Sequence, residues 1–200
     1  MSEISAAEAQ FIDCVVDQDF LDEVFGMLFI QGVDPAEALR RCGGRPETAR
    51  HRGHDEIRAL AQETNADYEP RPIAFVVPLR GWSLVTGSWL VAEEDRVAAA
   101  SRGSQSIGVM RHDYAASHAF SYAVDGELIT AFPPEALWRR YGVDADRLAP
   151  HAEAVGLSLA DDAETPDRPI AAVLLLAARL TGQLPTLTDF EGSLLSADVA

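Results

Sequence analysis

The residues best suited to chemistry in this sequence lie between Arg111 and His118. Arg111-His112-Asp113 is followed directly by Tyr114, and His118 comes four residues later. Histidine exchanges a proton near neutral pH, and a neighbouring carboxylate can orient its ring for acid–base work. Adjacent side chains of a strand point to opposite faces, however, so His112 and Asp113 are not expected to meet if both lie on a strand.

Together with Glu127, the two histidines His112 and His118 would carry catalysis if the protein binds or processes a small molecule as an enzyme. The familiar motifs of other mechanisms, G-x-S-x-G, G-x-x-x-x-G-K-[ST] and H-E-x-x-H, do not occur. All 16 basic residues are arginine, which excludes a lysine nucleophile. Because no coherent catalytic group emerges, a non-enzymatic interaction module is favoured, and the enzyme remains the alternative.

A basic segment runs from Arg50 through His51 and Arg52 to His54. Further arginines precede it at Arg40, Arg41 and Arg45. Arg50 and Arg52 are predicted binding residues, for a phosphate, an acidic partner or the protein's own acidic surface. The two histidines are three residues apart, as two metal ligands on one helix face would be. Gly53 disfavours a helix there and no third ligand is near, so neither a metal nor a cofactor is expected.

Aromatic residues offer a different kind of site. Trp82, Trp89 and Trp138, together with Tyr122, could line a ligand groove or simply fill the core. Trp82 and Trp89 are seven residues apart, which places them on opposite faces of a regular strand. One of them is therefore expected in the core and the other as an exposed anchor, and Trp89 is the predicted binding residue.

The charge balance of the chain narrows the choice of partner. Its 32 acidic residues outnumber the 16 basic ones, the net charge is −16, and residues 1–39 hold nine acids and no base. Such a field repels phosphate backbones and anionic lipids, so neither nucleic acid nor a membrane is expected as a partner. Either the acidity is a general property of proteins from the source organism, or the protein is an acidic adaptor or inhibitor of a basic partner. The predicted contact residues are Asp17, Asp19, Asp22 and Glu23.

Length and the apolar pattern indicate one cytoplasmic domain covering residues 1–200. The two cysteines, Cys14 and Cys42, lie on helix-like faces and are expected to be buried thiols in a reducing compartment. The first residues show no basic stretch followed by an apolar one, so no signal peptide is expected, and the longest apolar run, Ile170–Ala178, is too short for a bilayer span. The oligomeric state does not follow from the sequence.

The strand signals predict an α+β fold, with a mostly antiparallel sheet of five or six strands and helices on at least one face. The predicted strands are Val24–Ile30, Ile73–Leu79, Trp82–Val91, Gln105–His112, His118–Val124 and Glu127–Phe132. Asp125-Gly126 between the last two predicts a two-residue hairpin turn. That turn would pair Val124 with Glu127, Tyr122 with Ile129, and Phe120 with Ala131. Pro78 predicts an edge strand or a bulge.

Helix signals fall before, between and after these strands. Ser5 and Glu8 have the form of a capping box, and Asp34-Pro35 has the form of a second helix start. Further helices are predicted over Glu93–Arg102, Asp144–Val155 and Arg168–Leu180. The last of these is apolar nearly all round and is expected to be the most buried. Pro46–Thr64 is another helix candidate, but its first half is polar and contains Gly53, so it is expected to be partly loop. The helix within residues 1–19 is expected at the periphery, and the tail 186–200 is expected to fray.

Several short motifs resemble those of an uncharacterised actinobacterial family, a domain of unknown function. The matching stretches are Phe29–Pro35 before Glu37-Ala38-Leu39-Arg40-Arg41, Gly81–Leu84, Asp125–Leu128 followed by Phe132, and Thr181-Gly182. The resemblance covers most of residues 20–185 and implies a bacterial cytoplasmic protein. These motifs mark turns and helix ends. The family has no known activity, so no functional residue can be assigned from it.

Overall fold

The computed structural model describes residues 4–18, 20–63, 71–162 and 164–200. These residues form one eight-stranded sheet in the order β2-β8-β3-β4-β1-β5-β6-β7, and every strand pair in it is antiparallel. The strands are β1 (Val24–Gln31), β2 (Arg50–Arg52), β3 (Ile73–Leu79), β4 (Trp82–Gly87), β5 (Gln105–His112), β6 (Ala119–Val124), β7 (Glu127–Phe132) and β8 (Leu194–Asp198). The α-helices are α1 (Ala6–Asp17), α2 (Pro35–Arg41), α3 (His54–Ala61), α4 (Glu94–Ala100), α5 (Ala149–Glu153) and α6 (Pro169–Thr181).

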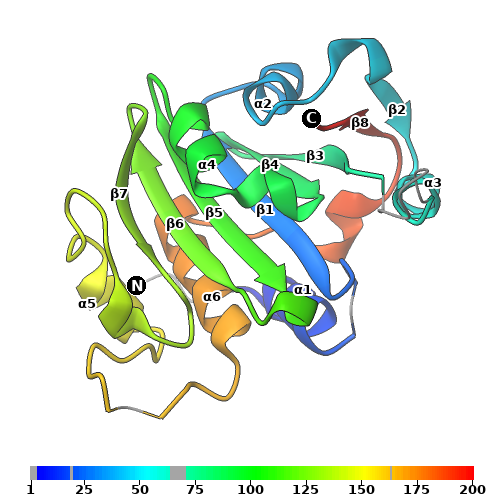
Figure 1. Ribbon diagram of the computed structural model, residues 1–200. Helices are drawn as coiled ribbons and strands as arrows, with labels where there is room; N and C mark the ends of the chain where they lie inside the picture. The colour runs from blue at the N-terminus through cyan, green and yellow to red at the C-terminus, as the bar shows by residue number, and fades with distance from the viewer. Residues whose placement is uncertain (1–3, 19, 64–70, 163) are drawn as a thin grey trace.

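Helices cover both faces of the sheet. Helices α2 and α4 lie on one face, and α1 and α6 lie on the other (Figure 1). The core is accordingly split by the sheet. The larger part includes Phe11 and Leu174 from α1 and α6, and the smaller includes Leu39 and Val97 from α2 and α4. The predicted α+β class is confirmed, and the sheet has eight strands instead of five or six.

The two strands that the sequence pattern misses are β2 and β8. Strand β2 has three residues, all of them polar, so it shows no apolar alternation to detect. Strand β8 lies in the predicted frayed tail, yet it sits inside the sheet between β2 and β3. The Arg71 guanidinium also binds the Asp198 carboxylate at 2.8 Å. The tail is ordered because β3, more than a hundred residues earlier, supplies its hydrogen-bonding partners.

The N-terminal helix differs from its predicted peripheral place. Ser5 and Glu8 form the predicted capping box at the start of α1. The apolar side of the helix is deeply buried, since Phe11 and Val15 are both 0% exposed. Phe11 stacks on Phe190 with ring centroids 5.6 Å apart. Helix α1 is therefore part of the core layer.

The Asp125-Gly126 turn has the conformation that the sequence predicts. Its φ angles are 53° and 87°, both positive, as a type I′ turn requires. Val124 pairs with Glu127 as expected, but the next two predicted pairs are wrong. An irregularity between Tyr122 and Ala123 shifts the register, so Tyr122 faces Thr130 and Phe120 faces Phe132. Phe120 and Phe132 then stack at 5.0 Å within the core.

Strand β3 is an interior strand, in contrast to the edge strand that Pro78 predicts. It pairs with β4 along its length, but β8 pairs with it only from Ile73 to Val76. Pro78 lies beyond the reach of β8, so its missing N–H costs no ladder hydrogen bond on that side. Pro78 thus lies at a position without a ladder partner on one side, as expected of proline, although the strand as a whole is not at the edge of the sheet.

Three predicted elements are shorter or of another kind. The strand predicted over Trp82–Val91 ends at Gly87 and is followed by the 3-10 helix η2 (Trp89–Ala92). The described part of Pro46–Thr64 holds a 3-10 turn, β2 and α3. Within Asp144–Val155 only Ala149–Glu153 is α-helical. Gly87 has φ 119° and lies against the backbone of Ile73, a close approach that ends the regular strand.

The long apolar helix α6 matches its prediction closely. It ends at Gly182, which takes the left-handed conformation expected of a C-cap glycine. Most of its side chains are buried, including Leu174 and Leu176 at 0% exposure. No helix in the described part of the chain is both long enough and apolar enough to cross a membrane.

Candidate functional site

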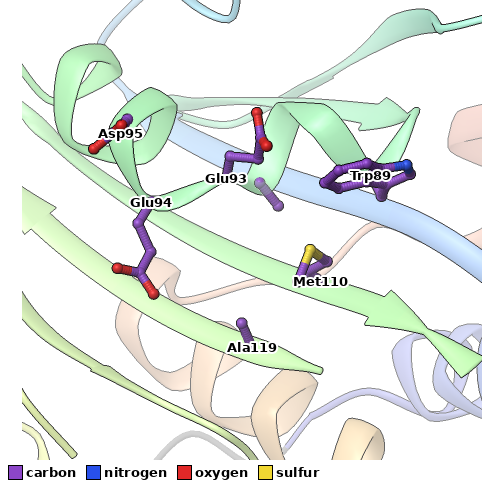
Figure 2. Close-up of a pocket in the computed structure, with 7 residues that line it drawn as sticks. Trp89, Glu93, Glu94, Asp95, Met110 and Ala119 are labelled. Carbon is purple, nitrogen blue, oxygen red and sulfur yellow. The ribbon is translucent and has the colours of Figure 1, made fainter. Parts of the chain in front are cut away.

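An open groove lies where η2 and α4 pass over β5 and β6, on the same sheet face as α2. Its volume is about 390 Å³. The lining residues, called here the Trp89 groove, are Trp89, Ala92, Glu93, Glu94, Asp95, Met110 and Ala119. Figure 2 shows the Trp89 ring at one end, Asp95 at the other, and Met110 and Ala119 on the strands below. The groove thus combines an aromatic wall, an apolar floor and a carboxylate rim.

Local sequence rules explain how these side chains come together. After β4 ends, the Ser88 hydroxyl accepts a hydrogen bond from Leu90 N–H at 3.4 Å and starts η2. The Trp89 ring packs against the His112 ring at 5.6 Å, so it covers the end of β5. Glu93, Glu94 and Asp95 then begin α4, where acidic residues interact favourably with the positive end of the helix.

The three carboxylates of the groove have few positive neighbours. Glu93 pairs with Arg96 at 3.2 Å. Glu94 accepts a hydrogen bond from the Tyr141 hydroxyl. Burial and the Glu94 carboxylate raise the pKa of Tyr141 to about 12, so this hydroxyl stays a neutral donor. Among the described residues Asp95 forms no ion pair, and the groove therefore carries a net negative charge.

The structure brings His112 and His118 together at one end of β5 and β6. The backbone N–H of His112 donates to Nδ1 of His118 at 3.2 Å. Nε2 of His118 faces two carboxylates, Glu135 Oε1 at 3.6 Å and Asp113 Oδ1 at 3.8 Å. The Arg111 guanidinium binds Asp113 at 2.7 Å and holds the pKa of that carboxyl below its ordinary value. Glu135 reaches this cluster from beyond β7, and no sequence motif marks it as a neighbour of the two histidines.

Glu127 does not belong to the histidine cluster. It pairs with Val124 at the Asp125-Gly126 turn, while His118 precedes the opposite end of β6. The three residues named for a possible enzyme are therefore two neighbours and one remote glutamate. His112 ends β5 and Asp113 begins the 3-10 turn η3 (Asp113–Ala115), so the alternation expected of a strand does not apply to this pair. The His112 ring contacts Trp89 and accepts a hydrogen bond from Ala115 N–H at 3.3 Å.

The predicted acidic contact residues are dispersed and partly paired. Asp17 binds Arg168 at 2.7 Å, and Asp22 lies 3.3 Å from Arg58. Glu23 lies just before β1, where its backbone carbonyl accepts a hydrogen bond from Asp113 N–H. Asp19 lies outside the described residues. Arginines from distant parts of the chain thus reduce the acidity of this N-terminal region.

The basic segment contributes to the sheet and the core. Arg50 is exposed, and its guanidinium bonds to nearby backbone carbonyls, with Ala49 O at 2.6 Å. Arg52 bonds to the Ser196 hydroxyl at 2.9 Å. His51 is exposed on β2, whereas His54 packs among aromatic rings, including Phe190 at 5.5 Å. His51 belongs to β2 and His54 begins α3, so the two histidines do not share a helix face. Burial and the Arg58 charge lower the pKa of His54.

The sequence analysis found one member of the Trp89 groove and missed the rest. Trp82 is 6% exposed and belongs to the core, whereas Trp89 is only partly exposed and lies on η2, outside the regular strand from which opposite faces were predicted. The acidic residues at 93–95 were predicted only as the start of a helix. Their closeness to Trp89 in the sequence could have indicated a shared site, because a turn between them would bring all four side chains to one rim. Within the described residues no group of three or more His, Cys, Asp or Glu side chains is arranged to hold a metal ion.

Comparison with known proteins places the chain in a family. No curated protein and no solved structure gives a significant match. The sequence profile of a family of unknown function (DUF6461) matches residues 12–191, which take in the second half of α1, every strand except β8, and α6. Helices α2 and α4 and the Trp89 groove all fall inside this range. The chain therefore belongs to the DUF6461 family of unknown function.

Proposed function

We propose that this protein is a non-enzymatic interaction module that binds a positively charged group of a partner protein in the Trp89 groove. The observation that carries the proposal is the composition of that groove. An indole and a thioether line its interior, and three carboxylates stand at its rim. This is the combination that an arginine or lysine side chain requires, with an apolar wall for its stem and negative charge for its head.

The interactions available in the groove are individually modest and add up. A cation over an indole ring gains about 0.5–2 kcal/mol, more when water is displaced. Methionine and aromatic residues are enriched at protein interfaces, and Met110 can adjust its shape to the incoming group. The net charge of −16 attracts a basic partner from a distance and raises its association rate.

A pulldown from the native cell extract, run at low and at high salt, tests this function. We expect the recovered partner to be basic and its capture to weaken at high salt. Trp89→Ala should abolish capture of the partner, and so should Glu93→Gln combined with Asp95→Asn. Trp138→Ala is the matched control, since Trp138 is 46% exposed on a different segment. Capture that survives Trp89→Ala unchanged contradicts the proposal.

A second candidate function is acid–base catalysis at the histidine cluster. The observation behind it is Glu135 Oε1, which is buried without a hydrogen-bond partner 3.6 Å from His118 Nε2. Under this alternative, the native protein should retain a small molecule that mass spectrometry detects after denaturation. His118→Gln should then release that molecule, while Trp89→Ala should leave it bound. Recovery of no metabolite from the wild type argues against this candidate.

A further inference from the structure

Three arginines surround a small surface cavity between α2 and α4, away from the Trp89 groove. The cavity measures about 180 Å³ and is lined by Arg40, Arg41, Ala99 and Arg102; it is called here the arginine pocket. Arg40 and Arg41 end α2, whereas Arg102 follows the end of α4. The two helices lie side by side on one sheet face (Figure 1). A water molecule occupies about 30 Å³ in the liquid, so the cavity has room for a small polyatomic ion.

Arg41 is the fixed wall of this pocket. Its Nη1 donates to the carbonyl oxygens of Ala100 and Arg102, both at 2.8 Å. Its Nε donates to Glu37 at 2.8 Å. These bonds satisfy two carbonyl oxygens at the end of α4 and just beyond it, whose partial negative charges would otherwise repel an anion. The Nη2 group forms no hydrogen bond with any described residue, so its donors remain available to a ligand.

Arg40 and Arg41 share a single carboxylate. Arg40 binds Glu37 through a two-point contact of 2.6 Å and 2.7 Å. The hydrogen bonds from both arginines lower the pKa of Glu37 to about 2, so it is ionised at neutral pH. One negative charge therefore faces two guanidinium groups. The side chain of Arg40 is 66% exposed, which leaves its remaining donors open to solvent.

Arg102 brings the third guanidinium without any carboxylate partner. It is exposed, and it lies over Gly126 at the hairpin turn, where an added Cβ would be 3.2 Å from its Cγ. Neither of the acids that flank Gly126, Asp125 and Glu127, forms an ion pair with Arg102 within the described residues. The pocket thus carries three positive charges against the single paired carboxylate of Glu37.

This local excess is unusual for the molecule. The chain has two acids for every arginine, and half of the arginines bind a described carboxylate that no other arginine shares, as Arg111 binds Asp113. The overall charge of −16 does not prevent anion binding here. Charges exposed to solvent are screened beyond about 8 Å at physiological ionic strength, so the nearest groups dominate.

We propose that the arginine pocket binds a phosphate-sized oxyanion, either free phosphate or the phosphate group of a small organic ester. Guanidinium groups present paired N–H donors that match the oxygens of such an anion. Arg41 positions the site, while Arg40 and Arg102 supply the exposed donors. The pocket is independent of the Trp89 groove and has the opposite charge, so either proposal can fail without the other.

Isothermal titration of the full chain with inorganic phosphate tests the pocket. The ionic strength is held constant with chloride, and glycerol phosphate is titrated in parallel. We expect saturable binding with one site per chain, and at least a tenfold loss of affinity in Arg40→Gln combined with Arg102→Gln. Glu37→Gln should tighten binding a few-fold, because it frees two guanidinium groups from their shared carboxylate. The ester tells the two sources apart: tighter binding than phosphate identifies an organic phosphate as the ligand.

Arg179→Gln is the matched control, because Arg179 is also exposed but lies on α6. An equal loss of affinity in this control, or heat that never saturates, would show only a general response to charge. Binding that persists in the double variant would overturn the proposal. Thermal unfolding of each variant confirms that it is folded, which is expected because Arg40 and Arg102 are both exposed.

Discussion

The backbone N–H of His112 donates a hydrogen bond to Nδ1 of His118, 3.2 Å away. A ring nitrogen that accepts an N–H bond carries no proton, so the neutral His118 ring holds its proton on Nε2. That proton faces Glu135 and Asp113. The histidine therefore accepts a hydrogen bond from the backbone, while its Nε2 lies 3.6 Å and 3.8 Å from two carboxylates, beyond hydrogen-bond distance.

This bond leads to a prediction about stability. His118→Leu leaves the partly buried His112 N–H without its acceptor, which should lower the free energy of unfolding by about 1 kcal/mol, the low end of the cost of an unsatisfied donor. His118→Asn places a carbonyl oxygen near the former Nδ1 and should cost less. Urea unfolding of both variants measures the difference. Identical midpoints for the two variants would mean that the bond contributes nothing to the free energy of unfolding.

A second prediction concerns pH. Hydrogen bonds from Arg40 and Arg41 lower the pKa of Glu37 from its ordinary 4.5 to about 2. Because the folded pKa is depressed, the associated stability is present above pH 4.5 and is lost as the pH falls toward 2. Glu37→Gln should remove this part of the pH dependence and leave the slope at higher pH unchanged. Melting curves of the wild type and the variant across this window should converge as the pH falls. Curves that stay a constant distance apart would contradict the predicted linkage.

The hairpin turn leads to a third prediction. Gly126 has φ 87°, which a β-branched residue strongly disfavours. Gly126→Val should therefore lower the free energy of unfolding by at least about 1 kcal/mol. Gly126→Asn is the control, since asparagine tolerates positive φ and should cost less. A valine variant as stable as the asparagine variant would show that the turn conformation is not needed.

Local signals predicted the α+β class, α6 and the Asp125-Gly126 turn, because each depends on residues adjacent in the chain. They failed where the partner is distant. Strand β8 forms because it pairs with β3, and no residue pattern within Leu194–Asp198 predicts that pairing. The predicted register of β6 and β7 was also wrong beyond the first pair, because an irregularity between Tyr122 and Ala123 shifts it and no residue pattern marks that position.

Site prediction failed for the same physical reason. Trp89 was identified by its residue type, but its neighbours Met110 and Ala119 come from β5 and β6. Arg40 and Arg41 were grouped with Arg50 by sequence proximity, whereas the fold groups them with Arg102 across two helices. Charge and residue type can be read from a chain, but the convergence of distant side chains depends on the sheet order.

The core of α6 leads to a fourth prediction, which compares neighbouring leucines. Leu174 is 0% exposed, while Leu175 is only partly buried at the edge of the same core. Leu174→Ala should destabilise the protein by about 2–5 kcal/mol, because it removes buried contacts and leaves a cavity. Leu175→Ala should cost clearly less. Urea unfolding compares the two, and an equal loss would contradict the assigned orientation of the helix.

The last prediction separates long-range attraction from direct contact in the binding of a basic partner. Asp17 and Asp22 already pair with Arg168 and Arg58, so their neutralisation changes the field of the molecule without altering the Trp89 groove. Asp17→Asn with Asp22→Asn should slow association at low salt and leave dissociation unchanged, because remote charges act on encounter.

Glu93→Gln with Asp95→Asn removes the same number of charges, but from the rim of the Trp89 groove. We expect this pair both to slow association and to speed dissociation, because these carboxylates would contact the bound cation directly. Surface plasmon resonance with the partner from the pulldown gives both rates at two salt concentrations. Screening should abolish the association difference at high salt and leave the dissociation difference in place. If both double variants dissociate at the wild-type rate, the basic group does not bind in the Trp89 groove.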